Sequence, residues 1–158
     1  MKNCILIDFD GTITKDDTTK TLVFELLKLN FLKFPRVFYY IIMLKLVKNK
    51  TLKQNYKNCM ISYLLYGLKI NKLTKLLNLF SYKVKKNIRP FMIEIIKKNF
   101  KKGNVILVVT ASPEITTKIC LTDLPVHVVG TEFSYKSGMF DNFYKLPSCY
   151  GTNKIKYI

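Results

Sequence analysis

Two carboxylates separated by one residue follow a short apolar run near the start of the chain. Residues 4–7 (CILI) are apolar, and the next three are Asp8, Phe9 and Asp10. An ionised carboxylate can attack phosphorus, whereas a protonated one can give a proton to the leaving oxygen. Close carboxylates also push each other's pKa values apart, which suits that division of roles. Their hard oxygens suit Mg²⁺ as well, so Asp8 and Asp10 are the predicted metal ligands.

A second set of polar groups follows the apolar run Val105–Val109 (VILVV), where the sequence continues as Thr110, Ala111 and Ser112. Both apolar runs have the length and branched residues of buried parallel strands. Functional groups in open α/β sheets gather at the carboxyl ends of the strands. We therefore expect these three residues to lie beside the two carboxylates.

The paired acids could instead bind calcium or belong to a purely structural turn. A calcium loop of the EF-hand type needs glycine at its sixth position and glutamate at its twelfth, but here Gly11 is fourth and Thr19 is twelfth. A structural turn would not account for two acids after a buried strand, where unpaired acids are costly. A catalytic site fits the pattern better than either of these.

The stretch after the first strand is expected to be entirely helical. No strand pattern interrupts residues 18–86, and Thr21–Leu29 has leucines on one helical face. Two more helices are predicted within Leu52–Tyr82, with a break near Gly67. This segment is therefore a helical insertion.

The most hydrophobic part of that insertion is Val37–Leu44 (VFYYIIML), between Arg36 and Lys45. It is much shorter than the roughly 20 residues that a membrane-spanning helix needs. It could lie on a membrane surface, but short apolar runs of this kind more often pack in a core. We therefore expect core packing.

The second half of the chain alternates helices and strands. A helix is predicted from Pro90 to about Phe100, followed by the apolar strand already described and by a turn at Thr110–Glu114 that leads into another helix. A third strand is expected at Pro125–Val129 and a hairpin at Thr131–Tyr144. Together these elements predict a parallel α/β sheet with a helical insertion after its first strand.

The charge is strongly positive and uneven. The formal net charge is +17, and residues 26–93 contain fifteen lysines and arginines but no acid. Such a segment attracts phosphates, whether lipid headgroups, nucleic acid or a soluble substrate. A general richness in lysine, asparagine, isoleucine and tyrosine explains the lysines equally well. Nucleic acid is not expected as a partner, because the aromatic residues lie in apolar runs rather than at spaced stacking positions.

The cysteines and the start of the chain bear on location. Cys4, Cys59, Cys120 and Cys149 are scattered without a C-x-x-C pair, which argues against a zinc site or a disulfide scaffold and suits a reducing cytosol. No signal peptide is evident before Asp8. We expect a cytoplasmic protein, with peripheral contact with an anionic membrane as a further expectation from the basic segment.

Three segments resemble the motifs of the haloacid dehalogenase (HAD) superfamily. Residues 8–14 (DFDGTIT) resemble the first motif, and residues 108–114 (VVTASPE) resemble the second. Lys154, shortly after Cys149-Tyr150-Gly151, resembles the lysine of the third. The order of the motifs, the helical insertion and the hairpin resemble subfamily IB, which includes enzymes like phosphoserine phosphatase and phosphatidylglycerophosphate phosphatase.

The resemblance implies a Mg²⁺-dependent phosphomonoester hydrolase that acts through a phospho-aspartate. Asp8 would be the nucleophile. Asp10 would act as general acid and then as base, and would offer Mg²⁺ its backbone carbonyl. Thr110 would bind a phosphoryl oxygen, and Lys154 would neutralise charge on Asp8 and the phosphate. The other implied substrate-binding residues are Thr12, Ala111 and Ser112.

The resemblance also implies a division into a HAD-like Rossmannoid core, residues 1–13 and 87–158, and a helical cap, residues 14–86. The family's fourth motif, an acidic G-D-x-x-x-D segment with a further Mg²⁺ ligand, does not occur before the last residue, Ile158. We therefore expect a C-terminally truncated chain that lacks the last core strands, unless Glu114 or Asp141 replaces the ligand. The substrate would be a phospholipid phosphate or a small phosphorylated metabolite. The alternative is an inactive remnant or binding module with the HAD fold.

Overall fold

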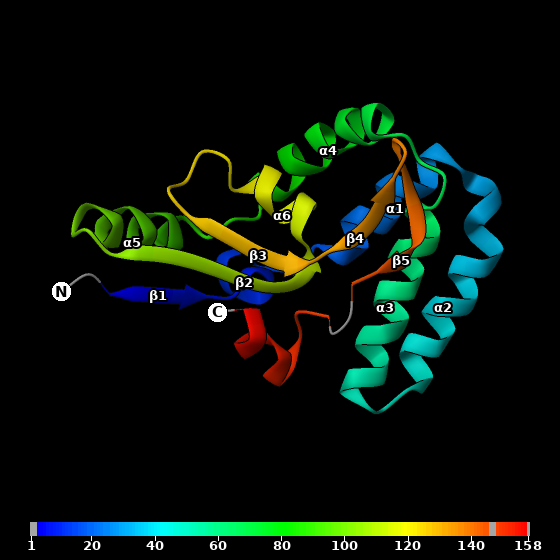
Figure 1. Ribbon diagram of the computed structural model, residues 1–158, viewed down its shortest axis with the longest axis horizontal. Coiled ribbons are helices and arrows are strands. Elements are labelled where there is room, and N and C mark those ends of the chain that lie inside the picture. Colours follow the sequence, from blue (N-terminus) through cyan, green and yellow to red (C-terminus); the bar gives the residue numbers. More distant parts are fainter. Residues whose placement is uncertain (1–2, 146–147, 158) are drawn as a thin grey trace.

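The computed structural model describes residues 3–145 and 148–157 and contains a parallel three-stranded sheet (Figure 1). Its strands are β1 (Cys4–Ile7), β2 (Val105–Pro113) and β3 (His127–Thr131), in the order β1-β2-β3. The register pairs Cys4 with Val105 and Ile7 with Val108. The carboxyl ends of β1 and β2 therefore lie side by side, and the predicted α/β fold with a parallel sheet is confirmed.

The second and third strands differ from the sequence prediction. β2 continues through Thr110–Ser112 to Pro113, where we expected a turn. An irregularity after Val109 shifts the register, but pairing with β3 resumes between Pro113 and Thr131, and the Thr131 hydroxyl donates to the carbonyl of Ala111 at 2.9 Å. β3 begins at His127 rather than Pro125 because its pairing with β2 begins there. The polar groups are thus part of the sheet and share its rigidity.

The stretch between β1 and β2 is helical, as predicted. Gly67, with φ of 74°, marks the expected break between the third and fourth helices. Figure 1 shows the second and third helices as an antiparallel pair at one end of the molecule, and the fourth helix packs against α6 (Glu114–Cys120). The bounds of the inserted helices are α1 Thr19–Leu29, α2 Phe34–Leu46, α3 Lys50–Leu65 and α4 Ile70–Lys85, with a 3-10 turn at Phe31–Lys33.

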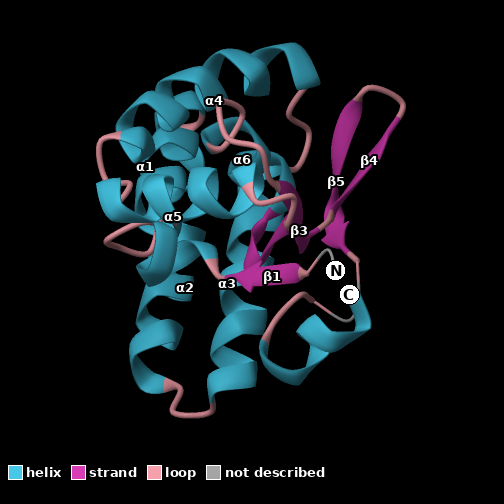
Figure 2. Cartoon of the chain, turned by 90° about the vertical axis from the view of Figure 1, so that its left-hand side faces the viewer, coloured by secondary structure: helices cyan, strands magenta, loops and turns pink. Residues whose placement is uncertain are grey.

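The remaining elements flank the sheet. Helix α5 (Pro90–Lys101) precedes β2, and the strands β4 (Phe133–Lys136) and β5 (Met139–Tyr144) form the predicted hairpin. Figure 2 shows this hairpin projecting away from the parallel sheet. β5 packs against α3, and the Phe140 N–H donates to the carbonyl of Leu68 at 3.2 Å. The hairpin therefore ties the inserted helices to the segment that follows the sheet.

The loop after β1 is anchored by two side chains in the core. Phe9 and Ile13 are fully buried, whereas Asp8 is exposed and Asp10 is half-buried. Between them Gly11 has φ of 75°, a left-handed conformation that glycine adopts without a steric cost. Truncating a buried phenylalanine costs about 3–5 kcal/mol. The apolar members of this loop therefore hold its acids in place.

The apolar run on α2 is not packed as we expected. Val37 and Tyr40 are buried, but Phe38, Tyr39, Ile41 and Ile42 are each at least 36% exposed. The physical reason is that all sides of this helix are apolar, whereas only one side contacts α3. Among the described residues, no helix combines the length and the apolar character needed to cross a membrane.

One lysine has a structural role in the insertion. The Lys33 ammonium donates to the carbonyls of Tyr63, Leu64 and Tyr66 at 2.9, 3.1 and 2.9 Å. These carbonyls lie at the end of α3, where the helix itself supplies no donors. Lys33 therefore closes the end of α3, and partial burial lowers the pKa of its ammonium.

Candidate active site

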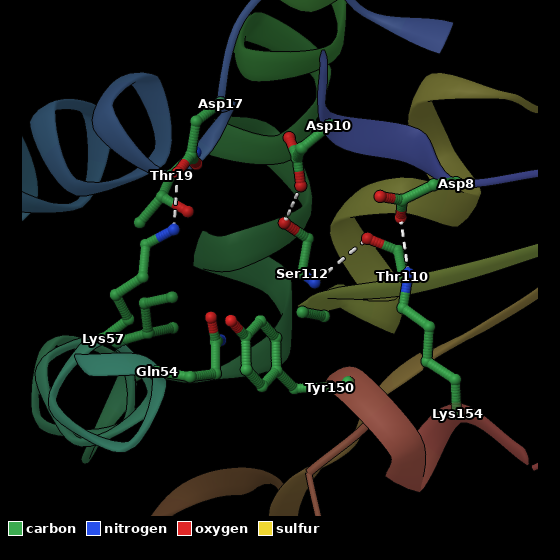
Figure 3. Close-up of a pocket in the computed structure, with 13 residues that line it drawn as sticks. Asp8, Asp10, Asp17, Thr19, Gln54, Lys57, Thr110, Ser112, Tyr150 and Lys154 are labelled. Atoms are coloured by element: carbon green, nitrogen blue, oxygen red, sulfur yellow. Dashed lines mark hydrogen bonds and ion pairs between the residues drawn. The ribbon is translucent and has the colours of Figure 1, made fainter. Parts of the chain in front are cut away.

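A cavity of about 400 Å³ lies at the carboxyl ends of β1 and β2. Its floor comes from the sheet, one side comes from α3, and the 3-10 helix Gly151–Tyr157 contributes from the C-terminal segment (Figure 3). The structure thus brings together side chains that are far apart in the sequence. The lining residues are Asp8, Asp10, Asp17, Thr19, Gln54, Lys57, Ile61, Thr110, Ala111, Ser112, Tyr150, Gly151 and Lys154.

Asp8 is paired with Lys154. The Lys154 ammonium donates to Asp8 Oδ1 at 2.8 Å, and the backbone N–H of Phe9 donates to the same oxygen at 3.0 Å. The side chain of Asp8 is 46% exposed, and within the described residues nothing donates to its Oδ2. One oxygen of Asp8 is therefore held while the other faces the cavity.

Asp10 is held on both oxygens. Its Oδ1 accepts from the N–H and the hydroxyl of Thr18, each at 2.8 Å, and its Oδ2 accepts from the Ser112 hydroxyl. Burial raises the pKa of Asp10, and the nearby Asp17 adds to the effect, although the hydrogen bonds from Ser112 and Thr18 oppose it. A carboxyl group that retains its proton more readily than usual is suited to act as an acid.

The predicted residues of β2 also line the cavity. Thr110 is 1% exposed and Ser112 is 6% exposed, and the N–H of Ser112 donates to the Thr110 hydroxyl oxygen at 3.1 Å. The Thr110 hydroxyl proton is left to donate to a ligand. Ala111 contributes to the lining as well, but Thr12 is exposed and does not. Substrate binding by Thr12 therefore stays a prediction.

Seven residues of the cavity were not expected from the sequence: Asp17, Thr19, Gln54, Lys57, Ile61, Tyr150 and Gly151. The Lys57 ammonium donates to Asp17 at 2.5 Å. Burial alone would raise the pKa of Asp17, but the hydrogen bonds from Lys57 and Thr19 together outweigh this effect, so the pKa is lowered. Gln54 and Lys57 are one turn apart on α3, and this i, i+3 pair of polar residues was the available signal.

The oxygen donors of the cavity fit Mg²⁺. The carboxylate of Asp8 and the backbone carbonyl of Asp10 are hard ligands, and Mg²⁺ usually keeps several waters beside one or two carboxylates and the substrate phosphate. The part of the chain that the structure describes contains no group of three histidine, cysteine or acidic residues that could enclose a metal. Glu114 accepts from Gly130 and Lys118, and Asp141 accepts from Ser134, so neither side chain faces this cavity.

Comparison with known proteins identifies a family. The model of the haloacid dehalogenase-like hydrolase family matches residues 5–158, which is nearly the whole chain. No curated protein matches the sequence significantly. The three motif segments in which the sequence resembles this family all lie within the matched residues.

Solved structures share the fold at low sequence identity. A protein of unknown function from Bordetella pertussis Tohama I superposes with a TM-score of 0.83 at 14% identity, over 99% of this chain and 72% of that one. A HAD family hydrolase from Salmonella enterica subsp. enterica serovar Typhi gives 0.70 at 13% identity, over 98% and 49%. A phospho-aspartyl intermediate analogue of phosphoserine phosphatase gives 0.57 at 22% identity, over 91% and 63%. The chain thus spans about half to three quarters of these proteins.

Proposed function

Since the chain belongs to the haloacid dehalogenase-like hydrolase family, we propose that it is a Mg²⁺-dependent phosphomonoester hydrolase of subfamily IB with Asp8 as its nucleophile. The observation that carries the proposal is the contact of Lys154 with Asp8 at 2.8 Å across 146 residues of sequence, beside Thr110 and Asp10. The structural relation to a phospho-aspartyl analogue of phosphoserine phosphatase supports the same chemistry.

The reaction would have two steps. In the first, Asp8 Oδ2 attacks phosphorus, the bond from phosphorus to the leaving oxygen breaks, and Asp10 gives its proton to that oxygen. In the second, Asp10 takes a proton from water, the water oxygen attacks phosphorus, and phosphate leaves with Asp8 restored as a carboxylate. The raised pKa of Asp10 supports its role as the acid in the first step.

The negative charge of the transferred phosphoryl group would be stabilised by three groups. Lys154 offers a positive charge where the nucleophile and the phosphoryl oxygens meet, and the Thr110 hydroxyl offers a hydrogen bond from β2. The Asp8 carboxylate and the Asp10 carbonyl would hold Mg²⁺, which neutralises phosphoryl charge when bound. Phosphoryl transfer depends mainly on such positioning and charge stabilisation.

We propose that residues 14–86 act as a cap over this site. Gln54 and Lys57 reach the cavity from α3, so the insertion forms part of its wall. A cap is useful because water must be kept from the phospho-aspartate until the leaving group has gone.

We further propose that the protein is cytoplasmic and that it contacts an anionic membrane through α2. The rings of Phe31 and Phe34 stack with their centroids 5.4 Å apart, and those of Phe34 and Phe38 stack with centroids 6.1 Å apart. All three residues are nevertheless 40–72% exposed. Leu32 next to Phe31 and Leu46 at the end of α2 are 90% and 69% exposed. An apolar stripe on a helix in a strongly basic segment is typical of proteins that bind the surface of anionic bilayers.

The test is phosphate release from p-nitrophenyl phosphate with Mg²⁺, combined with acid quenching and peptide mass spectrometry to detect a phosphoryl group on Asp8. Asp8→Asn should abolish both signals because the amide keeps the shape but is not a nucleophile. Asp16→Asn is the matched control, since Asp16 is exposed and lies outside the cavity. Equal turnover by the two variants would refute the proposal.

A phosphate-binding module without turnover is the second candidate. It is favoured by the finding that the described residues hold no group of three potential metal-binding side chains. Binding of inorganic phosphate that depends on Lys154, with no hydrolysis at any Mg²⁺ concentration, would support it over the enzyme.

A further inference from the structure

A second cavity lies beside the catalytic one, between α1, α2 and α3. Its volume is about 700 Å³, which is in the range of sites that hold small organic molecules. The three helices supply its walls with seven polar or charged side chains and with six apolar ones. The apolar ones are Val23, Phe24 and Leu27 from α1, Ile41 and Leu44 from α2, and Met60 from α3.

The two cavities adjoin each other. Five residues line both cavities and so form their border, and Figure 3 shows these residues around the first cavity, with Gln54 and Lys57 on α3. A molecule whose phosphoryl group meets Asp8 could therefore extend past this border into the apolar space. The shared residues are Asp17, Thr19, Gln54, Lys57 and Tyr150.

The walls of the second cavity leave apolar surface uncovered. Phe24 is 59% exposed and Ile41 is 36% exposed, whereas Leu22 and Leu26 on the core side of α1 are 1% and 2% exposed. Apolar surface in contact with water is unfavourable, and a cluster of it in a concave place indicates a binding site. The cavity therefore has the character of a site for an apolar group.

The rim of this cavity is positive. Four exposed lysines line it, and within the described residues none of them forms an ion pair. Among the described residues that line this cavity, the one acid is Asp17, which is already paired with Lys57 at 2.5 Å. Such a rim attracts anionic molecules and anionic surfaces. The four lysines are Lys20, Lys45, Lys50 and Lys53.

We propose that the substrate is an amphiphilic phosphomonoester whose apolar chain occupies the α1–α2–α3 cavity while its phosphoryl group lies at Asp8. This inference rests on the proposed phosphatase function and adds the class of substrate. A small polar phosphate would leave the apolar walls in water, whereas an alkyl chain covers them. The positive rim then faces the negative charges of the same molecule or of the surface that carries it.

The first test is a series of linear alkyl phosphates from ethyl to decyl, kept below their micelle concentrations, with Mg²⁺ and residues 1–158. The value of kcat/KM should rise about fourfold for each methylene that the cavity covers, which is the ratio that burial of one methylene gives. A value independent of chain length would overturn the inference. If no alkyl phosphate is hydrolysed, the proposed function fails. The inference about the cavity is then tested by calorimetric affinities for the corresponding alkylphosphonates, which should likewise rise about fourfold per covered methylene. Affinities independent of chain length would overturn it.

The second test compares two neighbouring residues of α2. Ile41 lines the cavity and is 36% exposed, whereas Ile42 is 40% exposed and does not line it. Ile41→Asp should reduce the gain in kcat/KM per methylene, whereas Ile42→Asp should leave both this gain and the turnover of ethyl phosphate unchanged. Leu44→Trp, which narrows the same space, should shorten the preferred chain. Equal effects of the two aspartate variants would overturn the inference.

The source of the amphiphile is tested with decyl phosphate as a free monomer and with phosphatidic acid in anionic vesicles. Turnover in either arm supports the substrate class, and the arm in which it occurs identifies a soluble or a bilayer source. Hydrolysis of ethyl phosphate with neither amphiphile hydrolysed would overturn the inference and leave the phosphatase function standing.

Discussion

The environment of Asp10 predicts that its ionised carboxylate lowers the stability of the fold, a cost that would come with its proposed role as the acid. Its carboxylate accepts hydrogen bonds from Thr18 and Ser112, yet its pKa is raised, because burial outweighs those bonds. Asp10→Asn removes the charge and can keep the contacts, since the amide oxygen can accept from Thr18 and the amide nitrogen can donate to the Ser112 hydroxyl oxygen. We expect this variant to be more stable than the parent at neutral pH.

The pH dependence follows from the direction of the shift. A carboxyl group whose pKa is higher in the folded state favours folding while it is protonated. This contribution is complete below the unfolded pKa of about 3.9 and is lost as pH rises through the folded pKa. The advantage of Asp10→Asn should therefore be absent at low pH and grow by about 1.4 kcal/mol per pH unit between the two pKa values, then stay constant.

The assay is urea unfolding of the parent and of Asp10→Asn across a pH series from acid to neutral. Glu25→Gln is the matched control with the opposite sign. Glu25 is 3% exposed. Burial alone would raise its pKa, but the hydrogen bonds and charges of Lys83 and Lys28 together outweigh this effect, so the pKa of Glu25 is lowered. Its contribution is present above its unfolded pKa and is lost as pH falls, so Glu25→Gln should destabilise by about 2 kcal/mol at neutral pH. The reasoning fails if Asp10→Asn is less stable than the parent at neutral pH, or if its advantage is the same at every pH.

Three further predictions concern catalysis and binding. Asp10→Asn should slow hydrolysis by about 10²- to 10⁴-fold, and by less for p-nitrophenyl phosphate than for an alkyl phosphate; equal losses would mean that Asp10 is not the acid. Lys154→Met should lower kcat/KM by about 10²- to 10³-fold in steady-state assays. Lys156 is an exposed residue on the same helix, so Lys156→Met is the control and should not lower kcat/KM. Equal losses in the two variants would remove the role given to Lys154. Phe38→Asp should reduce co-sedimentation with anionic vesicles at low salt, whereas Phe91→Asp should not. Phe91 is the matched control because the two rings are equally exposed, at 52% and 53%, but only Phe38 is on α2. Negligible binding of the parent to both anionic and neutral vesicles would remove the membrane proposal.

Local chemistry explains why much of the framework was predictable. The helical insertion, its break near Gly67 and the hairpin depend on periodicity and backbone preference within a few residues. The pairing of Lys154 with Asp8 was foreseen only through the family resemblance, because no local pattern selects one lysine among many across 146 residues.

What could not be predicted depends on contacts between distant segments. β2 extends through Ser112 because β3 pairs with it beyond the irregularity, and nothing near Thr110 in the sequence reports that pairing. The exposure of Phe38 depends on how many neighbours α2 has in space, and an apolar run does not contain that information. Gln54 lines the candidate active site because of how α3 is rotated, which only the packed structure shows.

The contact of Lys33 with the end of α3 has a consequence for how this basic chain tolerates change. Exposed lysines that make no contacts can be exchanged for neutral or acidic residues to reduce the net charge of +17 without loss of the fold. Lys33 differs, because its three carbonyl partners need a compact cluster of donors. The planar guanidinium of arginine directs its donors differently, and acetylation removes the charge. A charge-reduced version of the protein should therefore retain this lysine, however many of the others it replaces.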